Sequence, residues 1–257
     1  MKHRFVTVFF LSLLVLLALW SLFAAISTWV FVAVVAVWLL VVAIGSSHIA
    51  LNYHVKAMCS NPSEKERKIA LTFDDGPNEN TLQILQILKK HHAKATFFCI
   101  GRQIEKHPGI LREITADGHL VGNHSYSHSH FFDFFGMRRV VLELQETDKL
   151  IFEITGKKPH FFRPPYGVTN PSIRRALAVT KHAVMGWNIR SMDGISKNSD
   201  AIFNRIVEQL SPGSVVLLHD TRPHTALVLE QLLLTLAAKN YQVAALDELL
   251  DVEAYEN

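Results

Sequence analysis

The sequence predicts an α/β fold, a (β/α) barrel of about seven parallel strands preceded by an N-terminal transmembrane helical hairpin. Three observations lead to this prediction. Residues 5–45 carry no charged side chain. From residue 68 onwards, short apolar runs alternate with segments whose apolar residues recur at helical spacing. Acidic and histidine side chains directly follow several of the apolar runs, where the ends of parallel strands meet.

The N-terminal segment is too long for one membrane crossing. About 40 residues make a helix of roughly 60 Å, twice the hydrocarbon core of a bilayer. Two spans fit, from Phe5 to about Ala24 and from about Thr28 to Ile44. A single long span, or a signal sequence plus one span, stays an alternative. We therefore expect residues 1–45 to anchor the chain in membrane lipid, as a multi-pass protein of the cell membrane, in a bacterium the inner one.

The side of the membrane on which the remaining chain lies is left open. Positive residues precede the first span and follow the second, and such residues prefer the cytoplasmic side. A hairpin puts both of its ends on one side, so it predicts a cytoplasmic domain. A single span predicts a domain outside, near cell-wall polymers.

Residues 46–67 are expected to form a polar linker, and residues 68–257 a catalytic domain. Apolar runs predict the strands at 68–73, 95–100, 119–122, 161–162, 183–189, 214–218 and 241–246. Helical spacing predicts the helices at 79–92, 104–116, 137–155, 171–180, 200–210 and 227–238. Asp200 or Ser199 is the expected cap of the fifth helix.

Composition excludes several classes of function. A formal net charge of +3 gives no reason to expect a nucleic-acid partner, and we infer no obligate protein partner. The two cysteines, Cys59 and Cys99, indicate neither a disulfide framework nor a zinc–cysteine site. The 14 histidines, several of them clustered, suggest metal or proton chemistry.

Two adjacent carboxylates, Asp74 and Asp75, end the first apolar run and precede Gly76-Pro77. Side chains on a strand alternate between faces, but at a turn both carboxylates can reach one cleft. Such neighbours repel each other unless one binds a metal ion and the other a proton. The alternative is a strand-end turn with solvated charges.

His124 and His128 are four residues apart, so on one helical turn they share a face and can bind one ion. Together with Asp75 they would leave open positions on a divalent cation, as catalytic sites do. Asp74 would then be free to accept a proton from water. The alternative is a pair of surface histidines.

Three further residues complete the candidate site. Arg163 can hold Asp74 ionised, although a surface ion pair is the alternative. His219, at the end of the apolar run 215–218, can protonate a leaving amine, although it can also be a structural histidine. Asp193 is expected to orient either His219 or Arg163.

Four motifs in order resemble those of the polysaccharide deacetylases, the NodB homology domain of carbohydrate esterase family four. They are Thr72-Phe73-Asp74-Asp75-Gly76-Pro77, His124-Ser-Tyr-Ser-His128, Arg163-Pro-Pro-Tyr166 and Leu217-Leu-His219. The resemblance covers residue 68 to the C-terminus. It implies a distorted (β/α) barrel, and a hydrolase that removes acetyl groups from amino-sugar polymers with a divalent metal ion, often zinc.

The resemblance also implies a role for each matched position. It makes Asp74 the base, His219 the acid, and Asp75, His124 and His128 the metal ligands, with Arg163 and Asp193 in supporting catalytic roles. By the same resemblance, Pro165, Leu217 and Tyr166 contact the substrate. Leu217 lines the acetyl pocket, and the backbone N–H of Tyr166 donates to the oxyanion. In one departure, Gly194 stands where the family usually has tryptophan, which puts the usual grip on the substrate in doubt.

The leading hypothesis is a membrane-anchored, metal-dependent hydrolase that removes N-acetyl groups from an amino-sugar polysaccharide or oligosaccharide. One alternative is a deacetylase or deformylase of a lipid-linked sugar at the cytoplasmic membrane face. Another is an inactive carbohydrate-binding module. The Phe-rich stretch Phe131 to Phe135 fits a cleft lip, a membrane contact or core.

Overall fold

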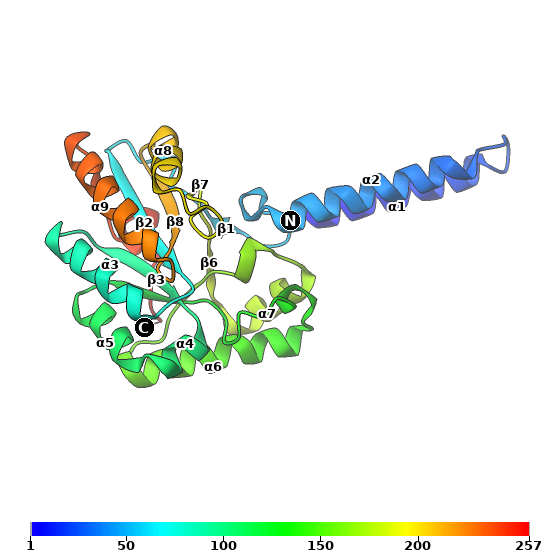
Figure 1. Cartoon of the computed structure of the whole chain (residues 1–257). Coiled ribbons are helices and arrows are strands. Elements are labelled where there is room, and N and C mark those ends of the chain that lie inside the picture. The colour runs from blue at the N-terminus through cyan, green and yellow to red at the C-terminus, as the bar shows by residue number, and fades with distance from the viewer. Residues whose placement is uncertain (1, 257) are drawn as a thin grey trace.

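The computed structural model describes residues 2–256 and has two parts (Figure 1). Helices α1 (Lys2–Trp20) and α2 (Thr28–Ser47) lie side by side and project from the rest of the chain. The Ser27 side chain accepts a hydrogen bond from the backbone N–H of Trp29, which caps the start of α2. Most of their large apolar side chains face outwards, as they would towards lipid.

One parallel sheet organises the remaining chain. Its hydrogen-bonded order is β1-β6-β5-β4-β3-β2-β8-β7, and β9 pairs with the start of β2. The strands are β1 (Ala57–Met58), β2 (Lys68–Asp74), β3 (Ala95–Cys99), β4 (Leu120–Asn123), β5 (Phe161–Phe162), β6 (Ala183–Met185), β7 (Ile189–Arg190), β8 (Ser214–His219) and β9 (Gln242–Val243). Within residues 2–256 no pairing joins β7 to β1, so the predicted barrel is a distorted one that stays open on one side.

Helices pack around this sheet, and the main hydrophobic core lies between the two (Figure 1). The helices are α3 (Glu79–Lys90), α4 (Gly101–Lys106), α5 (Pro108–Ala116), α6 (Met137–Thr155), α7 (Pro171–Thr180), α8 (Ser199–Gln209), α9 (Pro223–Ala238) and α10 (Leu246–Leu250). Strand β2 is the centre of the arrangement, because six of its seven residues are buried. A fully buried parallel strand reads as a continuous apolar run, as 69–73 does.

Three expected elements are corrected by the structure. The helix expected at 104–116 is two helices, because Pro108 cannot continue α4 and instead starts α5. The strand expected at 183–189 is split at Gly186, and its halves β6 and β7 lie in distant parts of the sheet. The cap of α8 is Asn198, whose side chain accepts from the backbone N–H of Ala201.

The residues that follow α2 enter the core of the domain. Ile49 and Val55 are less than 10% exposed and belong to a hydrophobic cluster with Phe132, Phe162 and others. Strand β1, inside the segment 46–67, pairs with β6 in parallel register. The chain therefore passes from the projecting helices into the folded domain through packed residues.

Candidate active site

The carboxyl ends of β2, β4 and β8 bring the chemically active side chains together. Register places Asp74, the last residue of β2, beside His219, the last residue of β8. Asp75 then leaves the strand with φ of 77°, in the left-handed region that side chains other than glycine rarely adopt. This turn is what lets two neighbouring carboxylates face one cleft.

Gly76 is required by a close approach in the same turn. A Cβ atom at this position would lie 2.1 Å from Oδ2 of Asp220, a buried carboxyl group. Asp220 also accepts a hydrogen bond of 2.7 Å from the hydroxyl of Thr81. Burial raises the pKa of Asp220 to about 7, and the charges of Asp75 and Asp74 act in the same direction.

Asp75, His124 and His128 form a cluster of potential metal ligands. Oδ1 of Asp75 lies 3.6 Å from Nε2 of His124 and 3.4 Å from Nε2 of His128. One ligand atom from each residue falls within 4.8 Å of the other two. Ligands of a tetrahedral zinc ion with bonds of about 2.0–2.1 Å lie roughly 3.3 Å apart, so the three donors suit such an ion.

The protonation of the two imidazoles agrees with a ligand role. Nδ1 of His124 lies 2.7 Å from the carbonyl oxygen of Arg163, to which it donates, leaving Nε2 as the ligand atom. Burial, together with the neighbouring His124, lowers the pKa of His128 to about 4, so this ring is neutral near pH 7. Burial opposes a charge on His124, but the carboxylates of Asp74 and Asp75 raise its pKa. The cluster thus favours positive charge, which a divalent cation would supply.

The loop that carries the two histidines is not the helical turn that their spacing predicted. His124 follows β4 directly, and the residues up to His128 form an irregular turn. Ser125 and His128 both have positive φ, of 64° and 46°. The two rings converge, with centroids 4.8 Å apart, because of this turn and not because of helical periodicity.

Arg163 is fully buried and fixes Asp74. Its Nη1 donates to Oδ1 of Asp74 and to the hydroxyl of Thr72, both at 2.8 Å. Its remaining nitrogens donate to the carbonyl oxygens of Met185 and Gly186 at the end of β6. Oδ2 of Asp74, on the other side of the carboxylate, lies 3.8 Å from Nε2 of His124. One oxygen of Asp74 is therefore tied to the guanidinium, and the other faces the ligand cluster.

His219 and Asp193 form a second ion pair across the cleft. Nδ1 of His219 lies 2.7 Å from Oδ1 of Asp193, while Oδ2 accepts from the backbone N–H of His219 at 2.7 Å and from the hydroxyl of Thr225 at 2.8 Å. Burial opposes the charge on His219, but Asp193 outweighs it and raises the pKa of His219 to about 9. Of the two partners considered for Asp193, His219 and Arg163, the structure shows a contact with His219. Because Asp193 binds Nδ1, Nε2 of His219 can face the cleft.

A cleft of about 280 Å³ is lined by the two carboxylates and three histidines described above, Asp74, Asp75, His124, His128 and His219, together with Leu217 and Trp187. Tyr166 stands on its rim, 41% exposed and with φ of 58°. Pro165, which precedes it, is buried. The Tyr166 hydroxyl lies 3.0 Å from Nδ1 of His130, a contact that the motifs did not predict. Gly194 borders the same cleft, so the position of the missing tryptophan is open to a ligand.

Comparisons with known proteins agree with this geometry. The family model described as Polysaccharide deacetylase matches residues 61–185. A peptidoglycan-N-acetylglucosamine deacetylase of Bacillus cereus is 36% identical over 195 residues, covering 72% of this chain and 71% of its own length. The chain belongs to the polysaccharide deacetylase family. The structure of the peptidoglycan deacetylase PdaC from Bacillus subtilis superposes with a TM-score of 0.68 at 32% identity, over 74% of this chain and 92% of that one.

Other members of the polysaccharide deacetylase family are longer. The peptidoglycan-N-acetylglucosamine deacetylase PgdA of Listeria monocytogenes is 31% identical over 188 residues, which is 73% of this chain. The match spans only 40% of the length of that relative. The chain therefore spans less than half of the length of PgdA, and what the two share is one domain.

A buried polar network supports the loop that carries His124 and His128 from behind. Asn123, just before His124, accepts from the backbone N–H of Ser125 and donates to Oδ1 of Asp148 on α6. Glu143, also on α6, accepts from the backbone and hydroxyl of Ser127. Sequence analysis missed these residues. The available signal was a pair of acidic side chains on the otherwise apolar face of an amphipathic helix.

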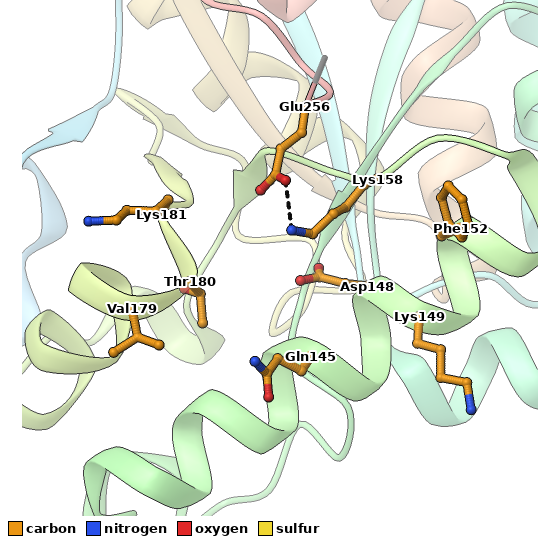
Figure 2. A pocket seen from close by; sticks show the side chains of 9 residues that line it. All are labelled: Gln145, Asp148, Lys149, Phe152, Lys158, Val179, Thr180, Lys181 and Glu256. Carbon is orange, nitrogen blue, oxygen red and sulfur yellow. Dashed lines mark hydrogen bonds and ion pairs between the residues drawn. The ribbon is translucent and has the colours of Figure 1, made fainter.

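Asp148 also borders a second cavity of about 440 Å³, away from the cleft (Figure 2). The cavity lies between α6, the end of α7 and the C-terminal segment, and Lys158 pairs with Glu256 at its edge. Asp148 accepts a second hydrogen bond, 3.1 Å long, from Nε2 of His182. Because this carboxylate is already bound to the network behind His124, we assign the cavity no chemistry of its own.

Proposed function

We propose that this chain is a metal-dependent hydrolase that removes N-acetyl groups from amino sugars in a polysaccharide or oligosaccharide. One observation carries the proposal. Asp74 has one oxygen bound to Arg163 and the other directed at three potential metal ligands, while His219 lies at the end of the neighbouring strand. A base, a ligand set and an acid thus share one cleft.

Asp75, His124 and His128 would hold the cation, and zinc suits two imidazoles and a carboxylate. When bound, such an ion polarises the acyl carbonyl and lowers the pKa of water at the site. Asp74 accepts a proton from the water that attacks the amide carbon, and Arg163, bound to Oδ1 of Asp74, holds the carboxylate in place for this step.

The remaining residues complete the reaction. The backbone N–H of Tyr166 donates to the oxygen on which negative charge develops. Leu217 offers an apolar wall to the acetyl methyl group in the cleft that Tyr166 also lines. As the C–N bond breaks, His219 gives its proton to the departing amine, and Asp193 holds the ring in the orientation that this transfer needs. The products are acetate and a free amino sugar.

The test is acetate release from chitin oligosaccharides by the purified full-length protein. Asp74→Asn and His124→Ala should each abolish turnover, and His124→Ala should also lose the bound metal measured by mass spectrometry. His92→Asn, an exposed histidine outside the cleft, is the matched control. Ordinary activity in either site variant would contradict the assignment.

We also infer that α1 and α2 are a membrane hairpin. Their 19 and 20 residues make helices of about 28 and 30 Å, close to the thickness of the hydrocarbon core. The side on which the domain lies can be read by labelling Lys197→Cys, an exposed position, with an impermeant thiol reagent in intact cells. Cys59 is a poor probe, because it packs against Gly186 and burial raises the pKa of its thiol.

A further inference from the structure

The base of the hairpin is joined to the domain without a flexible spacer. The carbonyl oxygen of Ser46, near the end of α2, accepts a hydrogen bond of 2.9 Å from the backbone N–H of Thr169. The Ser46 hydroxyl lies 3.0 Å from Nε2 of His54. Gly45 packs so closely on Tyr53 that a Cβ atom there would lie 2.5 Å from the ring. The domain is therefore held at a fixed place relative to the ends of the hairpin.

This attachment puts the rim of the cleft close to the bilayer. Tyr166, on the rim, is only three residues from Thr169, and three peptide units span at most about 11 Å. With the hydrogen bond to Ser46 added, the Cα atoms of Tyr166 and Ser46 lie no more than roughly 18 Å apart. The headgroup layer itself is about 5–8 Å thick. The cleft thus opens within reach of sugars that are held at the membrane surface.

Two exposed aromatic side chains lie beside the same attachment. Phe131 and Phe134 are 69% and 85% exposed, whereas Phe132 between them is fully buried in the cluster that contains Ile49 and Val55. We call Phe131 and Phe134 the aromatic lip. The buried Phe132 fixes this segment next to the first residues after the hairpin.

Hydrogen bonds also hold the aromatic lip beside the cleft. The side chain of Asn170 donates to the carbonyl oxygen of Asp133 at 2.7 Å, and its neighbour Thr169 binds the hairpin. His130, adjacent to the lip, contacts the hydroxyl of Tyr166. The lip, the rim of the cleft and the base of the hairpin thus adjoin one another. Exposed apolar side chains in a fixed patch mark an interaction surface, and here it is continuous with a membrane-spanning segment.

We propose that the aromatic lip enters the bilayer interface beside the hairpin, so that the cleft acts on amino sugars carried by lipid at the membrane surface. The part on substrate rests on the deacetylase function proposed above, and the part on docking rests on the membrane hairpin inferred there. Of the three interpretations left open for the Phe-rich stretch, Phe132 is core and the lip is a membrane contact.

Docking is tested by the depth of spin labels in the full-length protein, reconstituted in lipid nanodiscs. Phe134→Cys is compared with Phe152→Cys, both in a Cys59→Ser background. Phe152 is the matched control, because it is 54% exposed on α6 and about 22 Å further along the helix axis from Met137. We expect the label at 134 to collide more often with oxygen, and less often with an aqueous nickel chelate, than the label at 152 does. Equal exposure of both labels to the chelate would overturn the docking.

The substrate is tested with the double variant Phe131→Ser/Phe134→Ser and with Phe152→Ser as its control. We expect a loss of at least about tenfold in deacetylation of an N-acetylglucosaminyl lipid in nanodiscs, and unchanged deacetylation of a soluble chitooligosaccharide. An equal loss on both substrates would make the lip a sugar contact, and no loss on either would leave it without a role; both results reject the proposal. Failure of the unmodified protein on both substrates would instead reject the deacetylase function, and the label depths would still decide the docking.

Discussion

Asp193→Asn is the sharpest test of the proposed acid. The change is nearly isosteric, but it replaces the carboxylate that accepts from Nδ1 and from the backbone N–H of His219. Asp193 is what raises the pKa of His219 to about 9, against the opposing effect of burial. Without its charge, we expect that pKa to fall to the ordinary 6.5 or below.

The size of the effect follows from these two values. The difference between about 9 and 6.5 corresponds to about 3 kcal/mol of interaction that favours protonated His219. At pH 8, about nine-tenths of His219 is protonated at a pKa of about 9, but only about one-thirtieth at 6.5. Because the acid works only when protonated, activity should fall as pH rises through the pKa. The alkaline limb of the variant should therefore lie at least about 2.5 pH units lower.

The assay is kcat/KM for a soluble chitooligosaccharide from pH 5 to pH 10. Asp200→Asn, an exposed aspartate on α8, changes net charge equally and should keep the profile of the unmodified protein. A cation bound nearby lowers the pKa of His219 in all of these proteins, so the separation between the limbs is the diagnostic quantity. A variant whose activity drops by the same factor at every pH, with its alkaline limb unmoved, would refute His219 as the acid.

The same pair makes a linked prediction for stability. The pKa of His219 is raised in the folded state, so its contribution to the free energy of unfolding is fully present below about pH 6.5 and is lost as pH rises through about 9. Thermal unfolding at pH 6 and pH 10 should show this loss in the unmodified protein and little of it in Asp193→Asn. Arg163→Met should destabilise the domain by about 3–5 kcal/mol in urea unfolding, because it leaves the buried Asp74 unpaired, and adding Asp74→Asn should recover part of this; an additive double variant would contradict the pairing. Chelation should abolish acetate release and added zinc should restore it, but not in Asp75→Ala; activity that survives complete metal removal would reject the cation.

The sequence predicted the parts of the fold that depend on local pattern. The apolar run before Asp74 indicated a buried strand, and strand–helix alternation indicated parallel pairing with the polar residues at one end. Pro108 carried a readable signal for the break between α4 and α5. The separation of β6 from β7 at Gly186 could not be predicted in this way. The two strands pair with different parts of the sheet, and a short apolar run does not indicate its pairing partners.

The convergence of the candidate site residues depends on contacts that are distant in sequence. The four-residue spacing identified His124 and His128 as a pair, but it did so by assuming a helical turn, and residues 124–128 do not form one. Left-handed backbone at residues such as Asp75 and His128 persists only where surrounding structure enforces it. Part of that enforcement comes from Asn123 and Asp148, which are 25 residues apart. Residue type and order thus revealed the chemistry, whereas the geometry required the folded chain.

The packing of Ile49 and Val55 has a consequence for biosynthesis. These two residues leave the ribosome soon after the hairpin, but their core partners Phe162 and Val184 are made more than 100 residues later. The segment that contains Ile49 and Val55 cannot complete its packing until the strands that contact it have been translated. If α1 and α2 insert as the proposed hairpin, the packing that joins them to the domain therefore forms only after most of the chain has been made.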